Sequence, residues 1–135
     1  MRYLTASQIL LIHSMLIDEY GGSHGVRERN LLASLEQLPA QYAFGKELYP
    51  TMYLKSAVYA RNIITSHPFL DGNKRTGITC AAIFLENNGY IFDAKGGELE
   101  HYAILIAREK PALSEIAAWL KKHSKKIPRN SRLRE

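Results

Sequence analysis

The sequence has little cysteine and no long hydrophobic segment, and both features exclude classes of protein. Cys80 is the single cysteine in 135 residues, which rules out an internal disulfide and is too few for a zinc cage. The longest nearly apolar stretch, Ile78 to Leu85, is far shorter than the roughly 20 residues that span a bilayer. The sequence also lacks the charged and then apolar leader of secreted proteins. We therefore expect a cytoplasmic protein that does not associate with membranes.

Acidic residues are scarce at the C-terminal end. The whole chain has 18 Lys and Arg against 13 Asp and Glu, which gives a formal net charge of +5. Seven Lys or Arg and one His, with no acid, lie between Lys121 and Arg134. We therefore divide the chain into one domain at residues 1–123 and a basic tail at residues 124–135. The tail is expected to be a solvated terminus, and contact with nucleic acid or a partner protein is the alternative.

Repeats and low-complexity segments are absent, and the hydrophobic residues recur at helical spacing. Thr5 and Gln8 have the spacing of a capping box ahead of the first apolar stripe. Residues 38–50 have no helical period and hold prolines and aromatics, which predicts an exposed loop or hairpin, and residues 90–92 predict a short strand. The fold class is all-α, with helices predicted at about residues 6–20, 28–37, 52–66, 73–87, 99–108 and 114–123.

The turn between the third and fourth predicted helices concentrates reactive side chains. His67 stands before the stiff Pro68, and its ordinary pKa lies close enough to neutrality to take a proton from a hydroxyl. Phe69 is expected to enter the core and to fix the turn. Asp71 offers a hard oxygen ligand for Mg²⁺, which binds through one or two carboxylates and nucleotide phosphates. His67 is therefore the candidate base and Asp71 the candidate metal ligand.

The second half of the same turn has the features of an anion site. Gly72 lets an anion approach the backbone closely, and Asn73 begins a helix whose free amides attract phosphate. Lys74 and Arg75 add two cations beside these amides. A base, a metal ligand, free amides and cations are the groups needed to transfer a phosphoryl or nucleotidyl group.

Residues His67 to Arg75 match His-x-Phe-x-(Asp/Glu)-Gly-Asn-(Gly/Lys)-Arg, and the chain thereby resembles the Fic/Doc family. The resemblance to the death-on-curing (Doc) branch extends over most of the body, through Tyr20-Gly21-Gly22, Gly25-Val26-Arg27, Leu48-Tyr49-Pro50 and Phe84-Leu85-x-x-Asn88-Gly89-Tyr90. It implies the Fic fold, in which about six short helices surround a central helix that follows the motif turn.

The resemblance also implies roles for the residues of the turn. His67 would deprotonate a target Ser or Thr, Asp71 would bind Mg²⁺, and the anion hole and phosphate contacts would come from Gly72, Asn73, Lys74 and Arg75. A flap loop or hairpin would align the target segment, and its residues would be Gln41, Tyr42, Ala43 and Phe44.

Two positions indicate the type of reaction that the resemblance implies. The nucleotidyl-transferring Fic pattern has Gly where this chain has Lys74, and a second Arg where this chain has Ile78. Both features resemble the Doc branch, in which ATP is held in a reversed sense and its γ-phosphate is transferred. The resemblance implies a toxin that acts on translation elongation factor Tu.

Control is expected to come from another protein. The Ser/Thr-x-x-x-Glu-(Gly/Asn) segment of self-inhibited Fic proteins is absent from the sequence, so the implied inhibitor is an antitoxin of the Phd type. Two alternatives stay open: transfer of AMP, and a non-catalytic or nucleic-acid-directed toxin that uses the basic tail. Contact with nucleic acid is not the expected function.

The remaining reactive residue types are expected to be structural. Cys80 should be a buried thiol within the central helix. Arg61 should form a surface ion pair, and a contact with phosphate or with the target is the alternative. Surface positions or core packing are expected for the four other histidines, His13, His24, His101 and His123.

Overall fold

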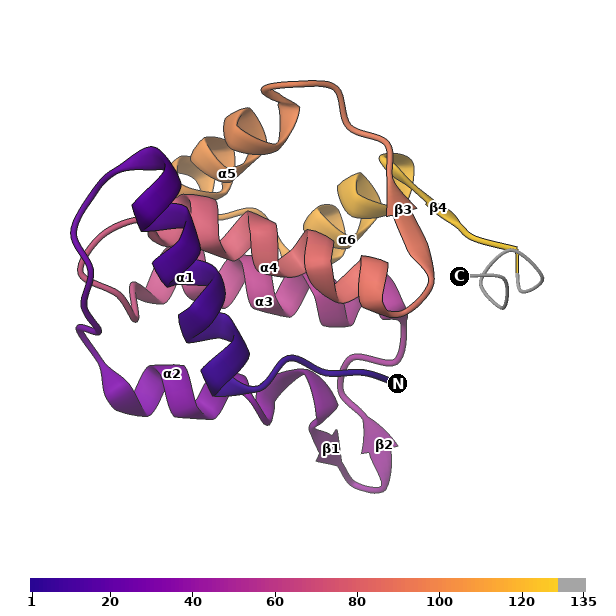
Figure 1. Ribbon diagram of the computed structural model, residues 1–135. Helices are drawn as coiled ribbons and strands as arrows, with labels where there is room; N and C mark the ends of the chain where they lie inside the picture. The colour runs from indigo at the N-terminus through magenta and orange to yellow at the C-terminus, as the bar shows by residue number, and fades with distance from the viewer. Residues whose placement is uncertain (129–135) are drawn as a thin grey trace.

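The computed structural model describes residues 1–128, and it is mostly helical, as the sequence predicts (Figure 1). The helices are α1 (Ala6–Tyr20), α2 (Arg29–Leu35), α3 (Met52–Ser66), α4 (Asn73–Asn87), α5 (Glu98–Glu109) and α6 (Leu113–Lys122), with a 3₁₀ turn η1 (Leu38–Ala40). The short strands are β1 (Tyr42–Ala43), β2 (Lys46–Glu47), β3 (Tyr90–Phe92) and β4 (Ser124–Lys126).

Three side chains fix where the first and third helices begin. The Thr5 hydroxyl accepts a hydrogen bond from the Gln8 amide at 3.1 Å, and the Gln8 side chain accepts one from the Thr5 amide at 2.9 Å. The predicted capping box is therefore confirmed. At the start of α3 the Thr51 hydroxyl accepts from the Leu54 amide at 3.1 Å, which satisfies an amide that has no partner within the helix.

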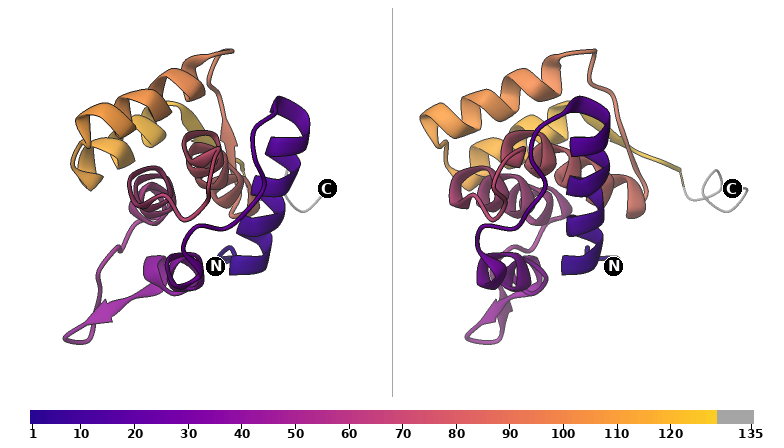
Figure 2. Two further views of the ribbon diagram at one scale, coloured as in Figure 1. Left: turned by 90° about the vertical axis from the view of Figure 1, so that its left-hand side faces the viewer. Right: turned by 60° about the vertical axis from the view of Figure 1, so that its left-hand side comes forward.

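The helices α3 and α4 form a central pair, with the others around them; the left view of Figure 2 looks nearly along both. The prediction of one central helix at 73–87 is confirmed for α4, but α3 is buried to a similar extent. Gly77 lets the two helices come close, because a Cβ at this position would lie 2.6 Å from Cγ1 of Ile64 and 3.1 Å from the Ala60 carbonyl oxygen. The motif turn is the direct link between these two helices, so their packing positions both of its ends.

The hydrophobic core has one part on each side of this pair. On the α5 and α6 side, Ile64 and Ile78 pack with Ile106, Ile116 and Leu120. On the α1 and α2 side the buried residues are Leu4, Ile9, Leu32, Leu35, Tyr59, Ile63, Phe69, Cys80 and Phe84. Phe69 of the motif turn is fully buried, as predicted.

Residues 38–50 contain the hairpin that the sequence allowed. Strands β1 and β2 are antiparallel and are joined by Phe44 and Gly45, which both have positive φ (52° and 77°). The side chain of Phe44 is fully exposed at the tip. At the base, the buried ammonium of Lys55 contacts the Glu47 carboxylate and donates to the Pro39 carbonyl at 3.3 Å. The hairpin is therefore anchored to α3 by an ion pair.

The structure corrects the boundary that the sequence placed after residue 123. Ser124–Lys126 forms β4, which is antiparallel to β3 with Tyr90 opposite Lys126. The Ile127 amide also donates to the Gly89 carbonyl at 2.8 Å. The first residues of the expected tail are thus part of the fold, because they satisfy the backbone groups of a strand that follows α4. The rest of the expected tail, residues 129–135, lies outside the described residues.

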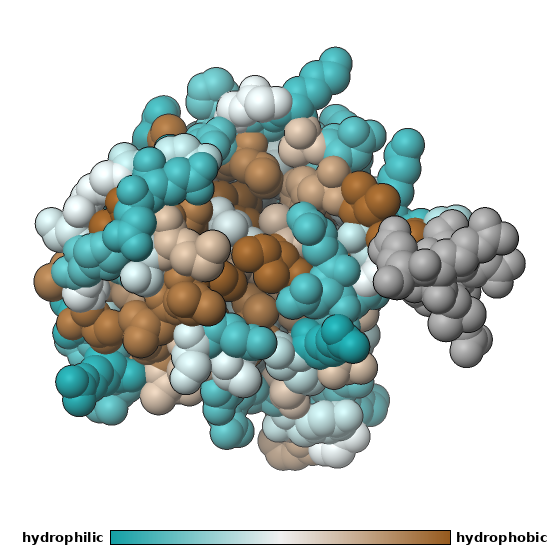
Figure 3. All heavy atoms as spheres, in the orientation of Figure 1, coloured by the Kyte–Doolittle hydropathy of each residue, from teal (hydrophilic) through white to brown (hydrophobic). Residues whose placement is uncertain are grey.

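Hydrophobic residues are exposed on the face that α1 presents. Brown apolar surface gathers on this side of the molecule in Figure 3, and Leu11 and Met15 of α1 are both exposed. None of the helices within residues 1–128 is both long enough and apolar enough for a membrane span.

Candidate functional site

The helix α3 ends at His67, whose backbone adopts a left-handed conformation (φ 54°, ψ 63°). A non-glycine residue in this region is strained by about 1–2 kcal/mol, and such strain is concentrated at functional sites. Arg27 holds the strained end of the helix in place: its Nε donates to the His67 carbonyl at 2.6 Å, and its terminal nitrogen donates to the Ser66 carbonyl at 2.6 Å. The His67 side chain itself is exposed.

The loop that follows α1 pairs with the motif turn along its backbone. The Arg27 and Glu28 amides donate to the Pro68 carbonyl at 2.7 and 3.1 Å, and the Leu70 amide donates to the Gly25 carbonyl at 3.1 Å. In the sequence, Gly25-Val26-Arg27 contributes to the family resemblance but does not indicate this role. The glycine, which has φ 132°, is the local signal for close backbone pairing.

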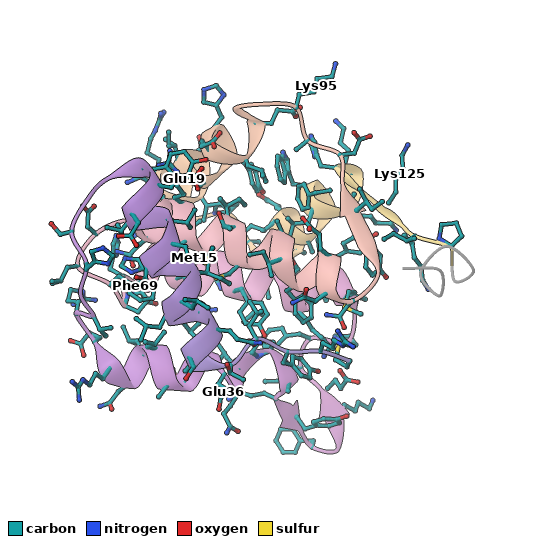
Figure 4. All side chains as sticks on the ribbon, in the orientation of Figure 1. Met15, Glu19, Glu36, Phe69, Lys95 and Lys125 are labelled. Atoms are coloured by element: carbon teal, nitrogen blue, oxygen red, sulfur yellow. The ribbon has the colours of Figure 1, made fainter. Side chains whose placement is uncertain are left out.

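Beneath the turn, His13 of α1 supports both Phe69 and Asp71. Its ring stacks on the Phe69 ring with centroids 3.8 Å apart and planes 3° apart, and Phe69 lies beside α1 in Figure 4. Its Nε2 lies 2.8 Å from the Asp71 carbonyl oxygen, which can only accept, so Nε2 carries the proton. Of the surface and core positions that the sequence left open for His13, the structure shows the core, but the bond to the turn was not predicted. The available signal is the spacing to Ile9 and Ile17, which share the buried face of α1.

The side chain of Asn73 belongs to the turn itself and is buried. Its Oδ1 accepts from the Phe69 amide at 3.0 Å and its Nδ2 donates to the Phe69 carbonyl at 3.0 Å. Gly72 precedes it with φ 75°, and the first hydrogen bond of α4 runs from the Thr76 amide to the Gly72 carbonyl. The amides of residues 73–75 therefore have no partner within the helix. The anion contact predicted for Asn73 thus rests on its backbone amide, while its side chain shapes the turn.

The carboxylate of Asp71 lies at the rim of the site and is turned toward backbone amides. Its Oδ2 accepts from the Ser23 amide at 3.0 Å and its Oδ1 accepts from the Gly72 amide at 2.9 Å. Each oxygen keeps a lone pair for a cation. Within residues 1–128, no group of three or more His, Cys, Asp or Glu side chains could form a cage around a metal. A single accessible carboxylate fits Mg²⁺, which keeps water ligands and takes the rest from phosphates.

A pocket with a volume of about 280 Å³ opens beside the start of α4. Its motif side has two cations, Lys74 and Arg75, and neither forms a salt bridge within residues 1–128. Its opposite side comes from α5 and has one carboxylate, Glu100, and an exposed apolar residue, Ile104. The complete lining is Gly21, Asp71, Gly72, Asn73, Lys74, Arg75, Glu100, Ala103 and Ile104.

The structure brings five of the predicted site residues together and leaves the others outside the pocket. Residues 71–75 line it, while His67 and the hairpin residues 41–44 do not. His67 lies at the other end of the turn, where its exposed ring faces solvent.

The other reactive side chains have structural surroundings. His24 is exposed and lies 2.8 Å from Asp18, and His123 packs on Trp119 and lies 3.0 Å from Glu98. The Lys95 amide, together with the His123 ring, lowers the pKa of Glu98. Cys80 is fully buried, as predicted, and burial raises the pKa of its thiol far above the ordinary value, which disfavours the reactive thiolate.

Comparison with known proteins identifies the family of the chain. The Fic/DOC family matches residues 3–85, which is 83 of the 135 residues. The chain therefore belongs to the Fic/DOC family.

Two relatives place it in the death-on-curing branch of that family. It is 28% identical to the protein kinase doc of Escherichia phage P1 over 124 residues, which cover 90% of this chain and 95% of the relative. It is 32% identical to the toxin Doc of Mycolicibacterium smegmatis over 87 residues, which cover 64% of this chain and 65% of the relative. The matched segment thus spans slightly less than two thirds of the second relative.

Proposed function

We propose that the protein is the toxin of a toxin–antitoxin module and transfers the γ-phosphate of ATP to a Ser or Thr hydroxyl of a target protein. The observation that carries the proposal is the pocket at the start of α4. Its motif side combines three helix amides that have no helical partner with two cations that form no salt bridge within residues 1–128. Such a surface favours a polyphosphate.

The proposed reaction uses His67 as the base. Its imidazole takes the proton of the target hydroxyl, and the hydroxyl oxygen forms a bond to the γ-phosphorus. The bond between that phosphorus and the oxygen that bridges to the β-phosphate breaks, and ADP leaves with the electron pair. Lys74, Arg75 and the amides of residues 73–75 hold the negative charge on the phosphate oxygens. A Mg²⁺ ion bound through Asp71 would supply further charge neutralisation on the phosphates.

Two residues of α4 support γ-phosphate transfer over AMP transfer. Ile78 stands where the AMP-transferring pattern has a second arginine, and it is 2% exposed in the core, so this position offers no cation to a phosphate. Lys74 instead adds a charge at the first turn of the helix. The phage relative, which carries the name of a protein kinase, also supports this choice.

The proposed target is translation elongation factor Tu, and the proposed inhibitor is an antitoxin of the Phd type. The two relatives support a toxin of this kind, because both carry the Doc name and one is called a toxin. In the target complex, the hairpin residues Gln41, Tyr42, Ala43 and Phe44 would hold the target chain. The exposed Tyr42 and Phe44 side chains support this role, since exposed aromatic residues often anchor protein partners.

The experiment that tests the proposal is transfer of label from ATP to purified elongation factor Tu. We expect the target to gain label from γ-labelled ATP and none from α-labelled ATP. Label from α-labelled ATP would instead support AMP transfer. Label in another protein of a cell extract, with none in elongation factor Tu, would leave the reaction standing and refute the target.

Two variants test whether His67 is the base and whether the basic C-terminal residues are needed. His67→Asn should lower the rate by about a hundred-fold to ten-thousand-fold, and Asn tolerates the left-handed backbone at this position. Lys125→Gln is the matched control, because this side chain is exposed and lies 4.0 Å from Asp93. A nucleic-acid-directed toxin predicts the reverse in a growth assay: His67→Asn stays fully toxic, whereas Lys125→Gln is less toxic because it removes one of the positive charges of the basic C-terminal segment.

A further inference from the structure

Tyr20, the last residue of α1, lies against the guanidinium of Arg75 at the edge of the pocket. The Cζ atom of Arg75 is 3.9 Å from the centre of the Tyr20 ring, well inside the distance of about 6 Å at which a cation is attracted to a ring face. The Tyr20 side chain is 55% exposed. Burial in the core therefore does not account for its position.

Within residues 1–128, Arg75 forms no salt bridge and no side-chain hydrogen bond that would fix its side chain. Stacking occupies one face of the planar guanidinium. It leaves the N–H donors, which lie in the plane of the group, available for oxygen atoms of a ligand.

We propose that Tyr20 is a positioning residue for Arg75 and that it holds the guanidinium ready for the phosphates of ATP; this inference rests on the proposed function. A free arginine side chain loses rotamer freedom when it binds phosphate, and the stack removes part of that loss before the ligand arrives. The adjacent Gly21 lines the same pocket. Tyr20 therefore lies next to the pocket and affects ligand binding through Arg75.

The first test compares substitutions at Tyr20 by their effect on ATP. Tyr20→Leu should raise both the dissociation constant and the KM for ATP by roughly three- to ten-fold, with a smaller change in kcat. Tyr20→Phe keeps the ring and should bind ATP like the wild type. Met15→Ala is the matched control, because Met15 is an exposed residue of the same helix and does not line the pocket.

A double-mutant cycle separates positioning from direct contact with the nucleotide. In an Arg75→Met background, Tyr20→Leu should have no further effect on ATP binding, because the group that Tyr20 positions is gone. An undiminished effect of Tyr20→Leu in that background would overturn the inference and assign Tyr20 a contact with ATP itself. Equal affinity of the wild type and Tyr20→Leu for ATP would also overturn it.

A second measurement keeps this inference distinct from the proposed function. In the ligand-free protein, the Arg75 side-chain protons should show ring-current shifts in NMR that persist in Tyr20→Phe and disappear in Tyr20→Leu. Absence of those shifts in the wild type would refute the stack whatever the protein binds. If the protein bound inorganic triphosphate but not ATP, the proposed function would be refuted. In that case, weaker binding of triphosphate by Tyr20→Leu than by the wild type would still support the positioning role of Tyr20.

Discussion

Replacement of Gly77 by alanine tests how closely the two central helices pack. The added Cβ would lie 2.6 Å from Cγ1 of Ile64, 3.1 Å from the Ala60 carbonyl oxygen and 3.3 Å from Cβ of Ile63. These neighbours have little freedom to move, because one is backbone and the others belong to fully buried β-branched side chains. The helices must therefore separate or shift.

The magnitude follows from two opposing effects. Overpacking of a core typically costs about 1–3 kcal/mol, while replacing glycine by alanine inside a helix gains about 1 kcal/mol. Because a backbone atom is among the clashing atoms, we expect an overpacking cost near the upper end of its range, about 2–3 kcal/mol. The net loss in the free energy of unfolding should then be about 1–2 kcal/mol. Denaturation by urea, followed by circular dichroism, measures this loss as a lower midpoint at unchanged slope.

The matched control is Gly96→Ala, because a Cβ at Gly96 has no neighbour within 4 Å and the residue does not have positive φ. Its stability should stay within about 0.5 kcal/mol of the wild type. Phosphoryl transfer should fall in Gly77→Ala at temperatures where it is still folded, since α3 ends at His67 and α4 begins with the phosphate amides. If Gly77→Ala were as stable as Gly96→Ala, the close approach of α3 and α4 would be refuted.

Three further substitutions or treatments test buried groups. Burial acts to lower the pKa of Lys55, but the contacts with Glu47 and Tyr3 together raise it above its ordinary value. Lys55→Met should therefore lose about 1–3 kcal/mol in the free energy of unfolding, measured by urea denaturation. A lysine whose pKa is raised by folding stabilises the folded state at pH values below its unfolded pKa of about 10.4. The stability difference between the wild type and Lys55→Met should therefore stay constant from about pH 6 to 9 and shrink above about pH 10.5. The Thr76 hydroxyl is buried without a hydrogen-bond partner among the described residues. Thr76→Val should therefore keep or raise the melting temperature. A clearly lower melting temperature would show that the hydroxyl has a partner. A thiol reagent at pH 8 should label Cys80 only after denaturation, because burial raises the pKa of this thiol, and fast labelling of the native protein would contradict that placement.

The parts of the fold that the sequence predicted are those that depend on local spacing. The cap at Thr5 and the helix end before Pro68 each follow from residues a few positions apart, as does the exposed loop or hairpin within residues 38–50, which is a hairpin at 42–47. The motif turn was predictable for a similar reason, since residues 71–75 form one continuous segment that lines one pocket.

The parts that the sequence did not predict depend on contacts between distant segments. Ser124 looked like the start of a solvated tail, because nothing near it in sequence shows that Phe92 lies opposite it in a strand pair. His13 and Arg27 gave no local sign of their bonds to the turn, which connect positions 58 and 40 residues apart. Side-chain patterns report which face of a helix is buried, but they do not report which element covers it.

These long-range bonds have a consequence for any attempt to move the motif into another protein. A peptide of residues 67–75 alone would lack the bond from His13 to the Asp71 carbonyl and the bonds from Arg27 to the end of α3. The left-handed backbone at His67 would then relax toward more common conformations, because nothing would oppose its strain. A graft that is to keep the shape of the turn must therefore include α1 and the loop that follows it, so the smallest transferable unit is most of the domain.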